Sequence, residues 1–347
     1  MTTITNDQRI PILNIVNTIA VADALGGGLE MESAESLVST DLSRYYERGN
    51  NPTYNSGYKP GMITDDTWMT LGLMTAVTKA NSNLSFELLL ASYQAMYDKE
   101  TQLIAEKKGK WWGGIEPVLQ GQIDFVSWRS DKLASITNPS NGSVMRAHIL
   151  GYLKDENLIA NFAEQDALFS HPHPVAADCS RVLALLVHRI VYKKLPVQEV
   201  IKEAIQIAKE ARVKSYLTRL DALPFVHVPI ETTKLVCVED DTNATTAAYM
   251  LRKGGIGVPC NALLTLGASL YVVKHVAGVL PAMQYAIKMG GDVDSTAVVV
   301  TSLTVAKTIT KPDTTEDPVL ADLKSKLHFQ EVLGEIASQF DAFLSKQ

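Results

Sequence analysis

Cysteine is scarce in this sequence. The 347 residues include only three cysteines, Cys179, Cys237 and Cys260, which are widely spaced and form no Cys-x-x-Cys pair. Such spacing indicates neither a disulfide framework nor a zinc site. The chain is nevertheless long enough to bury a sizeable hydrophobic core. Its 46% hydrophobic and 20% charged residues are an ordinary globular balance.

Long basic segments and long apolar segments are also missing. The formal net charge is −6, and no basic run exceeds the one in EKKGK, so a nucleic-acid partner is not indicated. No stretch approaches the roughly 20 apolar residues that a membrane span needs. The N-terminal segment lacks the basic region of a signal peptide. We therefore expect a soluble, cytoplasmic protein, and a monomer because no apolar seam is evident.

Helical periodicity dominates what is present. A first stripe with the spacing of one helix face runs from Ile12 to Ala20, and similar stripes recur along the chain. Strands of period 2 are scarce, and the β-branched run 297–305 follows a helix start, so we expect a buried helix there. No linker or repeat divides the chain, so the sequence predicts one all-α domain over residues 1–347. We expect loops at 26–64, 108–117, 129–143, 210–241 and 309–316.

Two adjacent carboxylates, Asp65 and Asp66, stand out in GMITDDTWMT, residues 61–70. Thr64 is a good helix N-cap, and acidic residues in the first turn suit the helix dipole. Capping alone therefore explains this motif when it is considered by itself.

A second acidic cluster changes that weighing. KMGGDVDSTAVVV, residues 288–300, places Asp292, Asp294 and Ser295 at a helix start directly after two glycines. The two clusters together offer four carboxylates and two hydroxyls, which suits Mg²⁺ or Mn²⁺ and is too rich for one ion. We therefore expect a two-metal site, with ions about 3.5–4 Å apart.

A third segment, VADALGGGLEM at residues 21–31, ends the first helical stripe. Asp23 continues that apolar stripe, which is an unusual place for a charge without a partner. Glycines follow, and then Glu30. A glycine-capped helix end is one interpretation; the other is a loop that passes close to a ligand and directs the Glu30 carboxylate at it.

With these segments in order, the sequence resembles the ADP-ribosylglycohydrolase family. The resemblance extends over roughly residues 10–305, and six motifs in the family's order make it specific. The matching segments are ADALGGGLE for GDALG…E, PGMITDDT for G-x-x-TDDT, NPSNGSVMRAH for GNGxxMR, SHPHP for TH-x-x-P, the Gly-rich GGIGVPCNALLTLGASLYV, and GGDVDST for GGDTDT.

The resemblance implies a hydrolase that cleaves the bond between the distal ribose of ADP-ribose and an acceptor, such as an ADP-ribosylated protein side chain. By the same resemblance, Glu30 or one of Asp65 and Asp66 transfers the proton. The implied ligands of two Mg²⁺ ions are Thr64, Asp65, Asp66, Asp292, Asp294 and Ser295.

The resemblance also implies a set of ADP-ribose contacts. Met145 and Arg146 are expected to pack behind the loop formed by residues 141–143. His171 is expected to contact a ribose or phosphate group, and His173 is a weaker candidate for such a contact. Trp68 replaces a smaller residue and would line the acceptor side of the cleft. The expected contacts are Asn141, Gly142, Ser143, His171, Gly255 and Gly257.

Two other interpretations use the same residues. A non-catalytic ADP-ribose-binding or structural protein is possible, because the family resemblance also reaches lens crystallins; intact metal ligands favour the enzyme. A two-metal phosphohydrolase would use the same carboxylates. Trp111 and Trp112 either stack on adenine or anchor a loop to the core, and we favour the anchor. VEDDTNATT, residues 238–246, imitates the acidic motif, but we expect a charged loop with an N-cap there.

Overall fold

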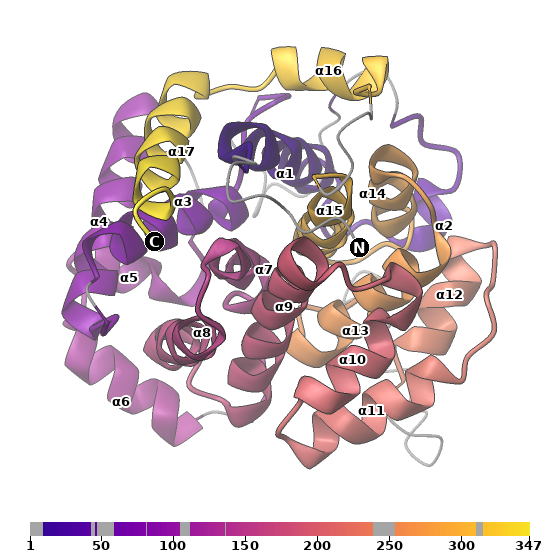
Figure 1. The fold of residues 1–347 in the computed structure, drawn as a ribbon, viewed down its shortest axis with the longest axis horizontal. Helices are drawn as coiled ribbons and strands as arrows, with labels where there is room; N and C mark the ends of the chain where they lie inside the picture. The colour runs from indigo at the N-terminus through magenta and orange to yellow at the C-terminus, as the bar shows by residue number, and fades with distance from the viewer. Residues whose placement is uncertain are drawn as a thin grey trace.

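The computed structural model describes residues 10–42, 46, 59–80, 82–104, 112–135, 137–238, 254–309 and 315–347. Within these ranges the regular elements are helices, and the only strand-like feature is an isolated bridge between Val258 and Gly291. The fold is therefore all-α, as predicted (Figure 1). The helices are α1 (Ile12–Gly27), α2 (Ala34–Leu37), α3 (Asp65–Lys79), α4 (Phe86–Leu103), η1 (Gly113–Ile115), α5 (Glu116–Leu119), α6 (Phe125–Ser135), α7 (Val144–Ala147), η2 (His148–Tyr152), α8 (Glu156–Ser170), α9 (Pro174–Lys193), η3 (Val197–Glu199), α10 (Val200–Ile207), α11 (Ala211–Asp221), α12 (Pro229–Val236), α13 (Ala262–His275), α14 (Val279–Ile287), α15 (Val293–Thr308), α16 (Pro318–Ser325) and α17 (Gln330–Leu344).

Helix α15 lies at the centre of the molecule. It packs against α1, α14, α13 and α9, which surround it in Figure 1. Its side chains are buried continuously from Val293 to Ala306. The run 297–305 is thus the buried helix that the sequence predicts. Because α15 contacts neighbours on all sides, the polar residues of its first turn lie deep in the molecule.

The structure corrects several loop predictions. The segment 210–241 contains α11 and α12, and the segment 129–143 begins inside α6. The buried stripe Val213, Tyr216, Leu217 and Leu220 had the required helical spacing, but the surrounding charges and prolines obscured it. Pro229 begins α12, where a missing N–H costs nothing.

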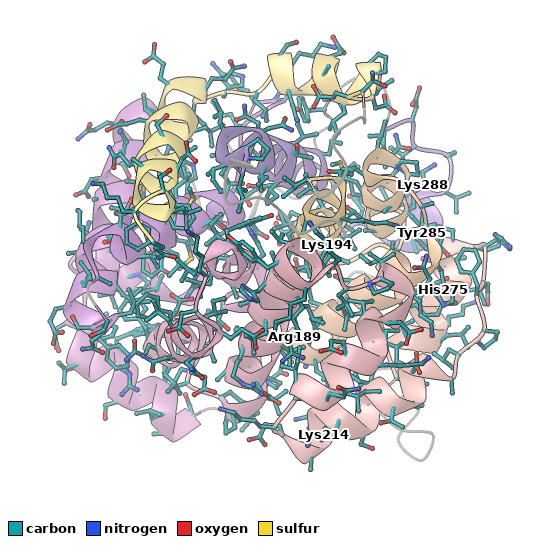
Figure 2. All side chains as sticks on the ribbon, in the orientation of Figure 1. Arg189, Lys194, Lys214, His275, Tyr285 and Lys288 are labelled. Carbon is teal, nitrogen blue, oxygen red and sulfur yellow. The ribbon has the colours of Figure 1, made fainter. Side chains whose placement is uncertain are left out.

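Ion pairs link helices on the outer side of this arrangement. Arg189 of α9 pairs with Glu156 at the start of α8 and with Glu203 of α10. Figure 2 labels Arg189 among the side chains between α9 and its neighbours. These partly exposed pairs hold the covering helices against α9 and take no part in the site described below.

None of the described helices combines the length and the hydropathy that crossing a bilayer requires.

Candidate active site

The start of α3 is attached to a buried carboxylate on α1. Asp23 is fully buried and accepts hydrogen bonds from the backbone nitrogen and hydroxyl of Thr64, at 3.0 and 2.7 Å. It also accepts from the backbone nitrogen and hydroxyl of Thr67, at 3.1 and 2.5 Å. The charge in the apolar stripe therefore has partners, which lie at the first turn of α3. Burial nevertheless raises the pKa of Asp23 to about 6.

Thr64 caps α3, as its sequence position predicts. Its hydroxyl accepts a hydrogen bond from the backbone nitrogen of Asp66 at 3.3 Å. The cap does not use the Asp66 carboxylate, whose Oδ1 atom is buried without a hydrogen-bond partner. A buried acceptor without a partner is costly in a folded protein. Capping thus explains why Thr64 stands at this position, but it does not explain why the Asp66 carboxylate is buried there.

The second acidic cluster is positioned by a backbone turn at Gly291. Gly291 has a φ of +86°, and a Cβ atom there would lie 2.1 Å from the carbonyl oxygen of Val258, so only glycine fits. Backbone hydrogen bonds connect this turn to two other segments. The Asp292 nitrogen donates to the carbonyl oxygen of Val258, and the Met31 nitrogen donates to the carbonyl oxygen of Gly291 at 2.7 Å. Since Met31 follows Glu30, this turn brings Glu30 and Asp292 together.

The first helix approaches the second acidic cluster closely. A Cβ atom on Gly26 would lie 2.4 Å from the Cα atom of Asp294. The glycines after Asp23 therefore allow α1 to pack against the first turn of α15. They do not form a left-handed cap, because Gly28 has a helical φ of −69°. The loop interpretation of Glu30 is the one that this geometry favours.

These segments converge on a cleft of about 470 Å³. Ligand oxygens of Glu30, Asp292 and Asp294 lie within 4.8 Å of one another. Thr64, Asp65, Asp66 and Ser295 line the same cleft. The two acidic motifs, more than 200 residues apart in sequence, thus form one oxygen-rich surface together with Glu30.

Crowding of these carboxylates disfavours their charged forms. Burial, with Asp292 and Asp65 nearby, raises the pKa of Glu30 well above its usual value. Burial also raises the pKa of Asp66, and the nearby charges of Asp23 and Asp65 raise it further. Asp294 is shifted upward in the same way, first by burial and then by Glu30 and Asp66. A bound cation would relieve this repulsion.

The cleft fits a hard divalent cation on two observations. The buried Oδ1 atom of Asp66 has no partner, and the donors gathered around it are carboxylate and hydroxyl oxygens. Oxygen donors of this kind suit Mg²⁺ or Mn²⁺. Glu30, which the sequence assigned to proton transfer alone, belongs to the group of carboxylates whose ligand oxygens lie within 4.8 Å of one another.

The expected ADP-ribose loop lies beside these carboxylates. Asn141 is 2% exposed, and its Nδ2 atom donates to Asp292 at 3.0 Å. Cys260 lines the cleft here, and its thiol donates to the side-chain Oδ1 atom of Asn141 at 2.9 Å. Gly142 and His171 also line the cleft. The structure therefore brings the metal-site candidates and three of the expected contacts together.

Three other expected contacts lie outside the cleft lining. Ser143 is fully buried and accepts a hydrogen bond from Ser180 at 2.9 Å. Gly255 packs on Ser33, and Gly257 packs on the Gly291 turn. We therefore leave Ser143, Gly255 and Gly257 out of the proposed site.

The tryptophans differ in their positions. Trp68 is fully buried and packs on Phe329 of the α17 N-terminus, with ring centroids 5.3 Å apart, so the prediction that it lines the acceptor side is wrong. It points away from the Asp66 side of α3, because residues two positions apart in a helix lie on roughly opposite faces. Trp112 is 1% exposed, and its indole nitrogen donates to Glu100 at 2.5 Å, as expected of a loop anchor. Trp111 lies outside the described residues.

The remaining sequence candidates are also placed. Arg146 packs behind the loop as expected, whereas Met145 lines the cleft. His173 lines the cleft and caps α9 by accepting from the Val175 nitrogen at 3.1 Å. The acidic decoy at Asp240 and Asp241 lies outside the described residues.

Sequence reasoning did not assign several residues of the cleft wall to the site, among them Trp128, Lys132 and Cys260. Lys132 lies above the Trp128 ring, with Nζ 5.7 Å from its centroid. Their i, i+4 spacing on α6 was the available signal, but the expected loop at 129–143 concealed it.

The comparisons with known proteins agree with this geometry. The family model of the ADP-ribosylglycohydrolases matches residues 15–308, so the chain belongs to the ADP-ribosylglycohydrolase family. A solved structure described as an "ADP-ribosylglycohydrolase-related protein complex" aligns with a TM-score of 0.64 at 18% identity, covering 96% of this chain and 97% of that chain. At this identity the likeness shows the fold alone. No curated protein matches the sequence.

Proposed function

We propose that the protein is a Mg²⁺-dependent hydrolase that cleaves the glycosidic bond between ADP-ribose and an acceptor. The acceptor is an ADP-ribosylated arginine or serine side chain, or a small ADP-ribose conjugate. Family membership supports ADP-ribosyl glycohydrolase chemistry in general. The observation that carries the proposal is the convergence of Glu30, Asp66, Asp292 and Asp294 beside the Asn141 loop in one cleft.

Two Mg²⁺ ions, or Mn²⁺ in their place, would be held by Thr64, Asp65, Asp66, Asp292, Asp294 and Ser295, all of which line the cleft. Bound divalent ions supply Lewis-acid stabilisation of developing negative charge and make water a usable nucleophile near neutral pH. Asp23 supports this arrangement from behind, because its hydrogen bonds fix the backbone of Thr64 and Thr67.

The carboxylates also suit the reaction itself. Cleavage of a glycosidic bond develops positive charge on the sugar ring, which neighbouring carboxylates stabilise. Glu30 lies on the loop after α1, lines the cleft next to Asp292 and Asp294 and is only partly buried, so its carboxylate can reach a ligand in the cleft. We assign the proton transfer to Glu30, and Asp65 or Asp66 is the alternative residue for that step.

The lining of the cleft carries charges of both signs, which would orient the substrate. The carboxylates line it together with Lys132 of α6, and the neutral His171 lines it as well. Lys132 is close enough to lower the pKa of His171, after the larger effect of burial and that of Arg146. A pyrophosphate favours the Lys132 side, which leaves the distal ribose at the carboxylates. The cleft therefore favours one orientation of ADP-ribose.

The test is a product assay with Mg²⁺ and two substrates, an arginine-ADP-ribosylated and a serine-ADP-ribosylated peptide. We expect the native protein to release free ADP-ribose from at least one peptide and Asp292→Asn to release none. Asp131→Asn, on the exposed face of α6, is the matched control and should retain activity. Release of AMP in place of ADP-ribose would indicate a phosphohydrolase. Binding of ADP-ribose without cleavage of any conjugate would indicate a non-catalytic binder; either result contradicts the proposal.

A further inference from the structure

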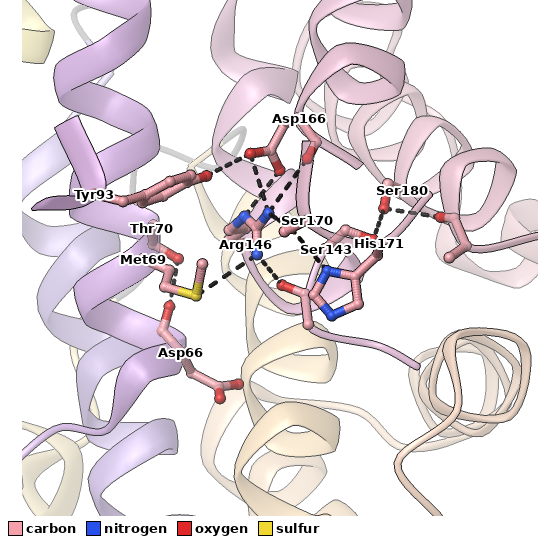
Figure 3. A network of polar contacts seen from close by, with 12 residues as sticks. Asp66, Met69, Thr70, Tyr93, Ser143, Arg146, Asp166, Ser170, His171 and Ser180 are labelled. Atoms are coloured by element: carbon pink, nitrogen blue, oxygen red, sulfur yellow. Dashed lines mark hydrogen bonds and ion pairs between the residues drawn. The ribbon is translucent and has the colours of Figure 1, made fainter. Parts of the chain in front are cut away.

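A buried arginine connects the wall of the cleft to the core. Arg146 and Asp166 are both fully buried and form a two-point ion pair: Nε lies 2.8 Å from Oδ2, and Nη2 lies 3.1 Å from Oδ1. Tyr93 donates its hydroxyl to the same carboxylate, and its ring lies 5.1 Å from the Arg146 guanidinium carbon. Figure 3 shows Arg146 between Tyr93 and His171. The guanidinium is thus held in one orientation.

From this fixed position Arg146 donates to two groups of the cleft wall. Its Nη1 atom donates to the Gly142 carbonyl oxygen at 2.5 Å, and its Nη2 atom donates to the Ser170 hydroxyl at 2.6 Å. The Ser170 oxygen lies 2.8 Å from Nδ1 of His171. One side chain therefore positions both the loop of Gly142 and the histidine beside it.

The number of protons available to the hydrogen bonds between Arg146, Ser170 and His171 determines the tautomer of His171. A guanidinium only donates, so the Ser170 oxygen accepts from Arg146. Within the described residues, the Ser170 hydroxyl has no acceptor other than His171. Its single proton is therefore donated to Nδ1, which must be unprotonated. In a neutral imidazole the proton then lies on Nε2.

We infer that Arg146 and Ser170 are positioning residues that hold His171 as the Nε2–H tautomer, so that it donates a hydrogen bond to an anionic oxygen of the ligand. Under the proposed function that oxygen belongs to the pyrophosphate of ADP-ribose, and this part of the inference depends on that function. The tautomer itself does not depend on it.

The surroundings of His171 fit a neutral donor. A Cβ atom on Gly142 would lie 2.7 Å from Cε1 and Nε2 of His171 and 3.7 Å from Nδ1, so the Nε2 edge faces this loop of the cleft. Burial, together with Arg146 and Lys132, lowers the pKa of His171 to about 3. The ring is therefore neutral at physiological pH, and its hydrogen-bonding role is set by its tautomer.

Nitrogen NMR of the histidine side chains tests the tautomer directly in the full-length protein. We expect the His171 signals of the native protein to show Nε2–H alone. Ser170→Ala should introduce a measurable fraction of Nδ1–H, and Ser170→Thr, which keeps the hydroxyl, should restore the native pattern. Nδ1–H in the native protein, or a Ser170→Ala spectrum identical to the native one, would overturn the inference.

A matched pair of substitutions tests the donor. The amide nitrogen of Gln can take the place of Nε2, whereas the shorter Asn places its amide near Nδ1. We expect His171→Gln to bind ADP-ribose within about threefold of the native protein and His171→Asn to bind about tenfold or more weakly, the size of a hydrogen bond to a charged group. Equal affinities of the two variants would overturn the donor role.

The two measurements separate this inference from the proposed function. If the native protein shows Nε2–H but binds no ADP-ribose, the proposed function and the ligand part of the inference fail, while the positioning by Arg146 and Ser170 holds. If ADP-ribose is bound and cleaved but His171 carries Nδ1–H, the positioning fails and the proposed function stands.

Discussion

The Asp23 carboxylate of α1 lies 2.7 Å from the Thr64 hydroxyl and 3.0 Å from the Thr64 backbone nitrogen. These residues are 41 positions apart, and the contact joins the first helix to the turn that carries Asp65 and Asp66. Asp23 is not itself a candidate metal ligand. Its hydrogen bonds nevertheless fix the backbone of the turn that carries the candidate ligands Thr64, Asp65 and Asp66. The effect of removing its charge is the first prediction.

Asp23→Asn should destabilise the protein by about 2–3 kcal/mol at pH 7, because an amide group would then face backbone and hydroxyl donors that now share a carboxylate. Chemical denaturation measures the free energy of unfolding. Asp131→Asn, at an exposed position, should change it by less than about 0.5 kcal/mol. Equal stability of Asp23→Asn and the native protein would show that the contact does not hold α3 in place.

Asp66→Asn should have opposite effects on stability with and without metal. After chelation, the variant should unfold at the same temperature as the native protein or higher, because burial and the charges of Asp23 and Asp65 disfavour the Asp66 carboxylate. Mg²⁺ at a hundredfold excess over its dissociation constant should stabilise the native protein by about 2.7 kcal/mol. The variant should gain much less.

Thermal unfolding of both proteins, with and without Mg²⁺ or Mn²⁺, makes this comparison, and Asp131→Asn again serves as the control. A native protein that neither ion stabilises would remove the metal site from the account.

Gly142→Ala should weaken ADP-ribose binding by about tenfold, because its methyl group would collide with the His171 ring. The strain should also lower the free energy of unfolding by about 1–3 kcal/mol. Gly334→Ala is the matched control: nothing lies within 4 Å of the new methyl group in α17, so it should leave binding unchanged and add about 0.5–1 kcal/mol of stability. Isothermal titration calorimetry and denaturation measure the two effects. Native-like binding by Gly142→Ala would show that the loop and His171 move apart freely.

His148 should make the protein less stable in acid. It is fully buried, neither ring nitrogen has a partner, and burial lowers its pKa to about 3. The unfolded chain takes up the same proton near pH 6.5, so between these values the unfolded state binds more protons. The free energy of unfolding therefore falls as the pH falls, by about 1.4 kcal/mol per pH unit from this residue.

His148→Leu should remove that contribution, so the stability of the variant should fall less steeply between pH 6.5 and 4.5 than that of the native protein. Chemical denaturation at a series of pH values gives both slopes. His227→Leu, at an exposed position, should keep the native slope. Identical slopes for His148→Leu and the native protein would contradict the burial argument.

The sequence predicted the helices whose apolar stripes are long, such as α1, and the buried helix that follows Asp292. It also selected the residues that meet in the cleft, because capping alone did not explain two acidic clusters of the same kind. Local signals were enough for these features, since helix periodicity and N-caps are encoded within a few neighbouring residues.

Features that depend on long-range packing were not predictable in this way. The hydrogen bonds of Asp23 come from α3, and Trp68 turns toward Phe329 of a helix at the other end of the chain. Neither partner is encoded near the residue itself. Lys132 was missed for a different reason: its helix is short, and most of its residues are exposed, so the apolar stripe that would have revealed it is weak.

The most direct test of the proposed reaction is cleavage of an ADP-ribosylated peptide in water labelled with heavy oxygen, with Mg²⁺ present. Hydrolysis at the glycosidic bond predicts that mass spectrometry finds the label on the ribose of released ADP-ribose, and that Asp292→Asn releases no product. Label on a phosphate of released AMP, or no cleavage of either an arginine-linked or a serine-linked substrate, would contradict the account.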